Sequence, residues 1–272
     1  MSLSALKDPG VWSALVAILA LVLSQLPPIR ELLTPSRVRL SLSDRLVLSH
    51  FLGNINLMAL VTVENLGSRK QTVAKLDGIL LDSSGGSRRL PAQQYVLRTP
   101  SPAAGQPMPE LLMAGIHLKR DEVWSETVRF FRLPSEDEEG RVGEIASQME
   151  KSIRKQAQLR PPEDQKLIEA EPGIVADAMA LFKDMFRLSK GNYTFLIAAL
   201  SDSGDVLDVQ GVEFTVYESA VQSLRSATED YRLGWGVCYP TQSNCAAYPR
   251  LRPIPSVQAK AMFQEGKSPR SS

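Results

Sequence analysis

An uncharged apolar run near the N-terminus constrains this chain more than any other feature. No Asp, Glu, Lys or Arg occurs between Asp8 and Arg30, and residues 11–26 are apolar on every helical face. Such a helix needs an apolar environment on all sides, either a bilayer or the centre of a large protein. Pro27 and Pro28 end the predicted helix, which is then just long enough to cross a bilayer once. We therefore expect a transmembrane helix over residues 9–28; a cleaved signal peptide and a buried core helix are the alternatives.

Basic residues that flank this run indicate its orientation. Arg30, Arg37, Arg39 and Arg45 follow the run, whereas only Lys7 and the α-amine precede it. Lys and Arg close to a spanning helix tend to stay on the cytoplasmic side. The sequence thus predicts a single-pass protein of the cell inner membrane whose body faces the cytoplasm.

Alternating polar and apolar residues after the run indicate a mainly β fold. Residues 37–43 alternate with period two, and residues 55–64 are apolar on both faces at their middle, which suits a central strand. Residues 192–200 and 212–217 form a closing hairpin around Gly204. About seven such strands predict an antiparallel β-sandwich, and the Gly-x-Tyr-x-Phe start at Gly191 resembles the last strands of immunoglobulin-like domains. Without the Cys…Trp…Cys spacing, an antibody-type domain is not expected.

A helical segment interrupts the strands. Ser135 and Glu138 have the spacing of a capping box, and apolar residues then recur at steps of three and four from Val142 to Ile153. A second helix follows Pro172. The predicted organisation is a tail (1–8), the spanning helix (9–28), a linker (29–36), the first part of the sandwich (37–133), a helical insertion (134–190), a closing hairpin (191–217), a C-terminal helix (218–236) and a loop with a disordered tail (237–272).

Composition and motifs exclude several functions. A formal net charge of +1 gives no general attraction to nucleic acid. The common hydrolase, zincin, P-loop and dinucleotide-binding signatures are absent. Two histidines are too few for a His-rich metal site. His50 and His117 lie on or beside predicted strands without a nucleophile motif, so we expect hydrogen-bonded structural histidines. The sequence therefore predicts no catalytic, cofactor or metal site and no enzyme.

The two cysteines leave three alternatives open. Cys238 and Cys245 are separated by six residues that include Pro240 and Asn244. A loop of this length could close on itself through a disulfide, which would indicate an oxidising compartment. Free thiols and, with further ligands, a metal site are the other interpretations. Cys238 and Cys245 are accordingly a candidate disulfide.

The overall order resembles a known group of proteins. An apolar helix ends in Ser-Gln-Leu-Pro-Pro-Ile at residues 24–29, and Gly-Asn-Ile-Asn-Leu at 53–57 leads into Val-Thr-Val-Glu-Asn-Leu-Gly at 61–67. This layout is similar to that of uncharacterised bacterial single-pass membrane proteins with a membrane-proximal immunoglobulin-like β-sandwich. The resemblance implies location and architecture and carries no activity.

Two functions from different classes follow. The first is a membrane-anchored, non-catalytic interaction or scaffold module, with the bilayer as partner through residues 9–28 and a protein as the other partner. The alternative is an outward-facing envelope enzyme or carbohydrate-binding domain with a Cys238–Cys245 disulfide. The redox state of the two cysteines in cells would distinguish these two functions, because a native disulfide favours the outward-facing protein.

Overall fold

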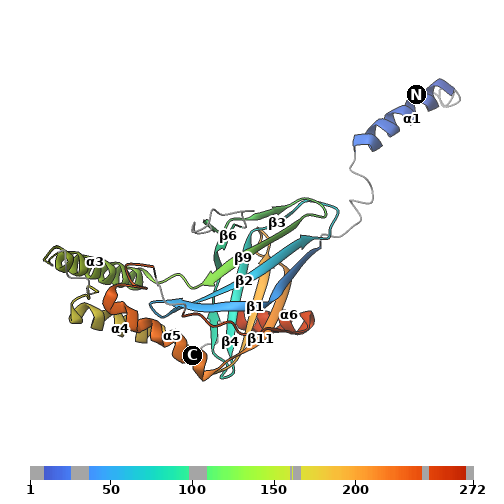
Figure 1. Ribbon diagram of the computed structural model, residues 1–272. Coiled ribbons are helices and arrows are strands. Elements are labelled where there is room, and N and C mark those ends of the chain that lie inside the picture. The colour runs from blue at the N-terminus through green and yellow to red at the C-terminus, as the bar shows by residue number, and fades with distance from the viewer. Residues whose placement is uncertain are drawn as a thin grey trace.

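The computed structural model describes residues 9–25, 37–97, 109–159, 161, 167–240 and 245–267. Its body consists mainly of antiparallel β-sheets, accompanied by a few helices (Figure 1). The mainly β class predicted from the sequence is thereby confirmed.

The first sheet has five antiparallel strands in the order β1-β2-β9-β6-β7. They are β1 (Val38–Phe51), β2 (Asn54–Asn65), β9 (Val123–Phe131), β6 (Ala92–Val96) and β7 (Glu110–Leu112). β1 is continuous and extends beyond the alternating residues 37–43, with a shift of register between Leu42 and Leu46. Buried residues alternate with partly exposed ones along all of β2, so one face of this sheet points into the core.

The second sheet has the order β12-β11-β10-β4-β5. Its strands are β12 (Arg252–Pro253), β11 (Val206–Val216), β10 (Gly191–Leu200), β4 (Lys75–Asp82) and β5 (Ser87–Arg89). β10 pairs with β11 from Gly191 opposite Val216 to Leu200 opposite Val206, so the expected closing hairpin forms. A separate two-stranded sheet joins β3 (Gln71–Val73) to β8 (Ile116–Leu118).

One apolar core lies between the two large sheets. The rings of Phe130 on β9 and Phe195 on β10 meet edge to face, with 5.3 Å between their centroids. Phe195, Ile197, Phe214 and Val216, which the alternation placed inward, are all buried. Each such side chain contributes roughly 1.5–3 kcal/mol through burial, so this contact holds the sheets together.

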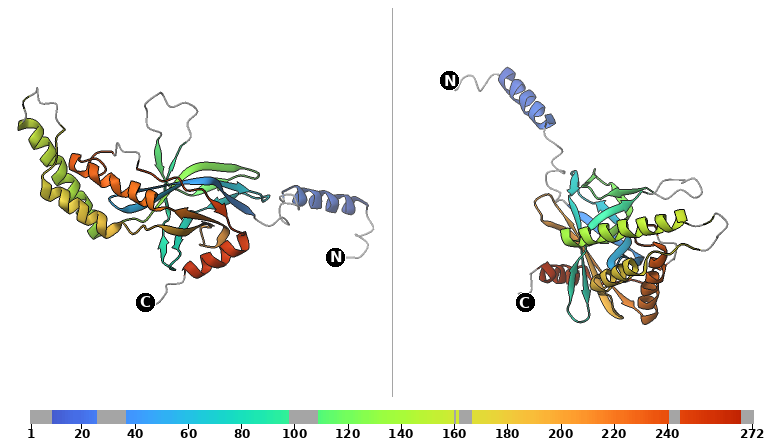
Figure 2. Two further views of the ribbon diagram at one scale, coloured as in Figure 1. Left: turned by 60° about the horizontal axis from the view of Figure 1, so that its bottom comes forward. Right: turned by 90° about the vertical axis from the view of Figure 1, so that its left-hand side faces the viewer.

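Helices α3 (Glu136–Leu159) and α4 (Pro172–Met185) occupy the chain between β9 and β10. The expected capping box is present: the Ser135 hydroxyl accepts from the Glu138 N–H at 3.3 Å, and the Glu138 carboxylate accepts from the Ser135 N–H at 2.7 Å. Both helices extend from one end of the sheets (Figure 2).

The turn between β1 and β2 fixes α4 against the sheets. Gly53 has a φ of +90°, and a Cβ atom at this position would lie 2.6 Å from the Phe182 carbonyl oxygen on α4. Such a close backbone approach is possible only for glycine. The insertion is therefore held at its C-terminal end by the hairpin tip.

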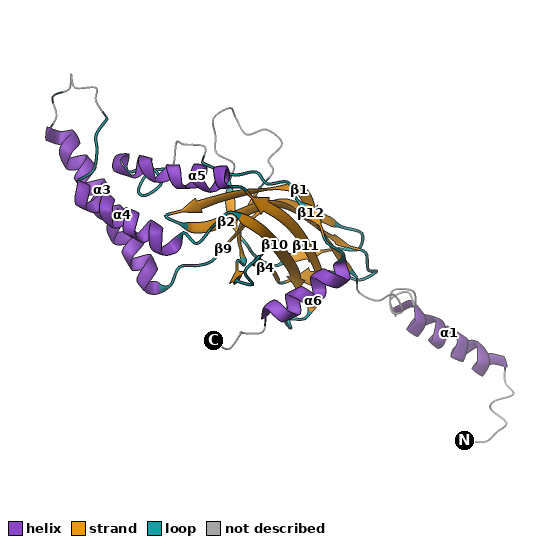
Figure 3. Ribbon diagram, turned by 90° about the horizontal axis from the view of Figure 1, so that it is seen from below, coloured by secondary structure: helices purple, strands orange, loops and turns teal. Residues whose placement is uncertain are grey.

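The C-terminal region differs from the expectation. After α5 (Glu218–Ser226) and the 3-10 helix η2 (Ala227–Leu233), the chain forms β12 and then α6 (Ser256–Lys267). For the described residues of 237–272, the predicted disordered tail is wrong. Figure 3 shows α6 along the second sheet, where Ala259 and Phe263 are fully buried in a cluster with Leu196 and Val209. The helix is ordered because it covers an apolar outer sheet face.

The N-terminal prediction is also wrong. Helix α1 runs over Pro9–Gln25. Within the described residues, no helix combines the length and the apolar character that a membrane crossing requires. The transmembrane helix over 9–28, the bilayer as a partner and the single-pass inner-membrane location are therefore withdrawn.

Candidate functional site

A cleft of about 1060 Å³ lies at the end of the sheets that carries the helical insertion. Its walls come from the start of β2, from β4 and β5, from the connection between β7 and β8, from the corner between β9 and α3, and from the end of α4. These segments are far apart in the chain and meet through the strand order of the two sheets. The cleft reaches the upper end of the roughly 300–1,000 Å³ found for ligand sites. It is therefore the candidate functional site.

Two carboxylates of the lining form close pairs with arginine. The buried carboxylate of Asp77 accepts from Arg89, whose Nε lies 3.0 Å from both oxygens and whose Nη2 lies 2.7 Å from Oδ2. Glu138 accepts from Arg132 at 2.7 and 2.8 Å. These hydrogen bonds, together with the Ser135 N–H, lower the pKa of Glu138 to about 2.

The third carboxylate of the lining, Asp184 on α4, lies 3.3 Å from the guanidinium of Arg141 on α3. All three acidic side chains of the cleft thus have an arginine partner.

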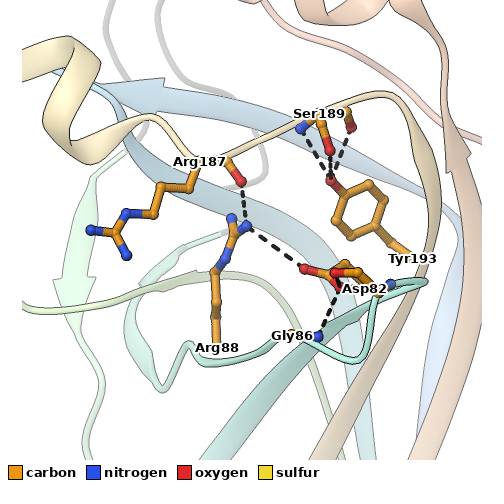
Figure 4. A network of polar contacts seen from close by, with 7 residues as sticks. Asp82, Gly86, Arg88, Arg187, Ser189 and Tyr193 are labelled. Atoms are coloured by element: carbon orange, nitrogen blue, oxygen red, sulfur yellow. Dashed lines mark hydrogen bonds and ion pairs between the residues drawn. The ribbon is translucent and has the colours of Figure 1, made fainter.

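Arg88 on β5 connects the sheet to the chain that follows α4. Its Nη2 donates a hydrogen bond to the backbone carbonyl of Arg187 and lies 4.0 Å from Asp82 Oδ2. Hydrogen bonds from Ser84 and Gly86, that of the Ser84 side chain first, lower the pKa of Asp82 and keep it charged. Figure 4 shows the Arg88 guanidinium between these two acceptors, with the Arg187 side chain directed away from the network.

Tyr193 at the start of β10 secures the same connection. Its hydroxyl donates to the Ser189 carbonyl at 2.9 Å and accepts from the Ser189 N–H at 3.2 Å (Figure 4). The Tyr193 ring is buried and stacks on Phe214. The segment between α4 and β10 is thus held at Arg187 by Arg88 and at Ser189 by Tyr193.

Two basic side chains of the cleft have no acidic partner among the described residues. Lys75 at the start of β4 and Arg187 after α4 are both exposed and line the cleft. Within the described part of the chain, neither forms an ion pair within 4.0 Å. In addition, Nη1 of Arg88 is buried and has no hydrogen-bond partner. The cleft therefore contains two cations without an ion-pair partner and one N–H donor without an acceptor among the described residues.

Apolar side chains form the rest of the lining. Met113, Met185 and Leu133 contribute to the wall, and Leu133 is 60% exposed. An exposed leucine beside two methionines offers adaptable apolar contacts to a bound molecule. The cleft thus combines an apolar surface with unpaired cations.

Both histidines lie outside the cleft lining. The Nε2 of His50 is 2.8 Å from the Leu224 carbonyl, its Nδ1 accepts from the Gly53 N–H at 3.2 Å, and its ring packs on Phe182 and Phe186. Burial lowers the pKa of His50, against the opposing effect of the bond to Leu224. His50 is thus a hydrogen-bonded structural histidine, as predicted.

His117 lies on β8, where its Nδ1 is 3.1 Å from the exposed Thr72 hydroxyl. The contact joins β8 to its partner strand β3. His117, too, is therefore engaged in a cross-strand contact.

The two cysteines are free thiols in the structure. Cys238 lies in the turn after η2, where its Sγ is 3.5 Å from the Gly234 carbonyl, and burial raises its pKa. Cys245 is 3.8 Å from the Ser226 hydroxyl. Part of the loop between the cysteines, residues 241–244, lies outside the described residues. The disulfide stays a prediction.

Among the residues that the structure describes, no group of three or more His, Cys, Asp or Glu side chains is arranged to hold a metal ion. No protein-family profile matches the chain, and no curated protein matches it significantly.

Among solved structures, the chain has a slight similarity to a β-glucosidase from Streptomyces venezuelae in complex with D-glucose, with 15% identity and a TM-score of 0.24. The match covers 66% of this chain and 15% of the enzyme, so the chain spans a small part of that protein's length. A TM-score this low supports no conclusion about fold or activity.

Sequence reasoning did not find the cleft. Lys75, Arg88 and Arg187 are separated by 13 and 99 residues in the chain, and no local motif joins them. One signal was available: Arg88 and Arg89 are adjacent basic residues that closely follow the Ser-Ser-Gly-Gly run at residues 83–86. Only the strand order brings them beside the end of α4.

Proposed function

We propose that this protein is a non-catalytic interaction module with an immunoglobulin-like β-sandwich, and that a protein partner binds in the cleft beside the helical insertion. The observation that carries the proposal is the cleft itself, which joins apolar wall residues to basic side chains that lack partners among the described residues.

The strand order supports the immunoglobulin-like assignment. In those domains one sheet has the order A-B-E-D and the other G-F-C, with C′ added in some. Taken in chain order, β1, β2, β4, β5, β6, β9, β10 and β11 correspond to A, B, C, C′, D, E, F and G. The observed orders β1-β2-β9-β6 and β11-β10-β4-β5 then reproduce both sheets. The insertion falls in the E–F connection.

The Tyr193 contact supports the same assignment. Immunoglobulin-like domains carry a tyrosine near the start of strand F whose hydroxyl bonds to the backbone a few residues upstream. Tyr193 lies at the start of β10, the equivalent of F, and bonds to Ser189. This corner is distinct from the disulfide of antibody domains, so its presence fits a chain without that cysteine pair.

Binding, as opposed to chemistry, is supported by the state of the polar groups. The acidic side chains of the lining are each paired with arginine, and His50 is used in a structural contact away from the lining. The groups left over are cations and apolar side chains, which suit the binding of a ligand that is acidic and partly apolar. Loops and insertions on a rigid sandwich commonly form such binding surfaces.

Site-specific photo-cross-linking tests the proposal. A benzophenone amino acid is placed at Leu133, on the cleft wall, and in a matched variant at Val257, an exposed apolar position on α6 outside the lining. On irradiation of cells that make the protein, we expect a discrete adduct with one partner from position 133 only. The isolated partner should then bind the purified protein with a measurable Kd.

Equal adducts from both positions, or an adduct at 257 alone, would contradict the assignment of the cleft as the binding surface. Turnover of the captured partner by the purified protein would contradict the non-catalytic assignment.

A further inference from the structure

We infer that the cleft recognises an acidic side chain on a short segment of the partner, next to an apolar side chain. This inference rests on the proposed function and specifies the chemistry of the bound segment. Arg187 would bind the carboxylate at the end of the cleft next to α4, and Lys75 would bind a further acidic group of the segment toward the other end of β4. The apolar side chain would contact the methionine and leucine wall.

The charge of the lining is the first argument. Five basic and three acidic side chains line the cleft, although the whole chain carries a net charge of only +1. Because all three acidic groups are paired with arginines, the basic surplus is concentrated in the partnerless Lys75 and Arg187. Unpaired cations at two places of one concave lining favour an acidic segment and disfavour a basic one.

The rigidity of the site is the second argument. Arg187 follows α4 on a backbone segment that Arg88 binds at the Arg187 carbonyl and Tyr193 binds at Ser189. A flexible arginine on a fixed backbone loses less freedom on binding than one on a free loop. Its side chain points away from these contacts, so it remains available for a ligand (Figure 4).

An unsatisfied donor supplies the third argument. Nη1 of Arg88 is buried without a partner, which is an unfavourable state for a charged N–H group. A carboxylate oxygen is the kind of acceptor that would satisfy it. An amide or an ammonium group would do so less well or not at all.

The apolar wall determines what accompanies the acidic group. Met113, Met185 and the exposed Leu133 lie in the same lining as the two cations. A free small anion would leave this surface uncovered, whereas a peptide with alternating acidic and apolar side chains would use both parts. An inorganic anion and an acidic peptide share the oxyanion chemistry, and the experiment separates them.

Binding of a defined peptide to the full chain tests the inference. The probes are acetyl-Glu-Leu-Glu-Leu-Glu-amide, the same peptide with Gln in place of Glu, and inorganic phosphate, each titrated calorimetrically. We expect the Glu peptide alone to bind. Its affinity should weaken as ionic strength rises from about 0.01 M to about 0.15 M, because the Debye length falls from about 30 to about 8 Å.

Matched variants locate the interaction. The double variant Lys75→Gln with Arg187→Gln should weaken binding of the Glu peptide about tenfold or more, because two charge-assisted contacts are lost. Lys183→Gln removes an exposed cation of the same helix α4 that does not line the cleft, and it should leave the affinity unchanged. Thermal melting of each variant establishes that it is folded.

Several outcomes would overturn the inference: no binding of the Glu peptide, equal binding of the Gln peptide, phosphate binding as tight as that of the Glu peptide, or an equal loss of affinity in Lys183→Gln. Its failure is distinguishable from failure of the proposed function. A partner cross-linked from position 133 together with a Glu peptide that does not bind retains the interaction module and rejects the acidic segment. A Glu peptide that binds in the absence of any cross-linked partner retains the oxyanion site and rejects the protein-binding module.

Discussion

The Tyr193 hydroxyl lies 2.9 Å from the backbone carbonyl of Ser189, four residues earlier in the chain, and donates a hydrogen bond to it. It also accepts from the Ser189 N–H. One buried side chain therefore satisfies both backbone groups of a residue at the corner between the insertion and β10. Because Arg187 lies two residues before Ser189, this corner also positions the cleft.

Tyr193→Phe should destabilise the protein by about 1–2 kcal/mol, because it removes the hydroxyl and leaves the ring packing in place. Tyr217→Phe is the control, since Tyr217 is 70% exposed, and it should change the free energy of unfolding by less than about 0.5 kcal/mol. Urea denaturation measures both. Equal effects would mean that the corner does not contribute to stability.

Two glycines with similar backbone angles should respond differently to alanine. Gly53 has a φ of +90° and Gly204 a φ of +85°. A Cβ atom added at Gly53 would lie within 3 Å of backbone atoms at the end of α4, whereas one added at Gly204 would meet nothing within 4 Å. Gly204→Ala should cost about 1–2 kcal/mol from its left-handed conformation alone. Gly53→Ala should cost at least about 2 kcal/mol more, and it should loosen α4, because the close backbone approach is lost.

Differential scanning calorimetry of the two glycine variants, with hydrogen exchange of α4, tests this comparison. If the two substitutions had the same effect, the hairpin tip would not be in contact with α4 as described.

Strand patterns were predictable because they depend on local sequence. The alternation in residues 212–217 placed Phe214 and Val216 inward, and both are buried. The capping box at Ser135 and Glu138 was likewise readable, since both partners lie within one helical turn. A pattern of this kind needs no knowledge of the rest of the fold.

Helix α6 was missed because prolines and polar residues around it suggested disorder. The signal lay elsewhere: β10 is buried on both faces over most of its length, and Leu196, Ala198 and Leu200 require a cover on the outer side of the sheet. Ala259 and Phe263, four residues apart, provide it. The N-terminal prediction was wrong although the apolar run was clear, because no helix of the described residues has the length and apolar character of a membrane span.

The ion pair of Glu138 should make the protein sensitive to acid. Its pKa is lowered from 4.5 to about 2, mainly by Arg132, so its contribution to stability is complete above pH 4.5 and is lost as the pH falls through about 2. Glu138→Gln should remove part of this acid sensitivity and cost about 1 kcal/mol or less at neutral pH, because the pair is partly exposed.

Glu139→Gln, an exposed neighbour in the same helical turn, provides the matched control. Denaturation curves at several pH values between about 5 and about 2 should show a flatter profile for the Glu138 variant only. A flattening of the same size in the Glu139 variant would exclude the Arg132 pair as the cause.

His50 should produce a second pH dependence, close to neutrality. Its folded pKa lies below 6.5 because burial disfavours the imidazolium, and protonation would also replace the acceptor at Nδ1 that binds the Gly53 N–H. As the pH falls below about 6.5, the unfolded chain takes up a proton that the folded chain resists, so the stability present above 6.5 decreases. The free energy of unfolding should therefore fall between about pH 7.5 and about pH 5.5.

His50→Gln should reduce stability at neutral pH by about 1–3 kcal/mol and abolish this slope, because no group at position 50 then titrates. His117→Gln, at the exposed histidine of β8, should retain the slope. Urea denaturation across the same pH range gives both results. Parallel stability profiles for the unaltered protein and His50→Gln would show that His50 does not titrate in a buried environment, and the contact that joins β1 to Leu224 would then not be maintained in solution.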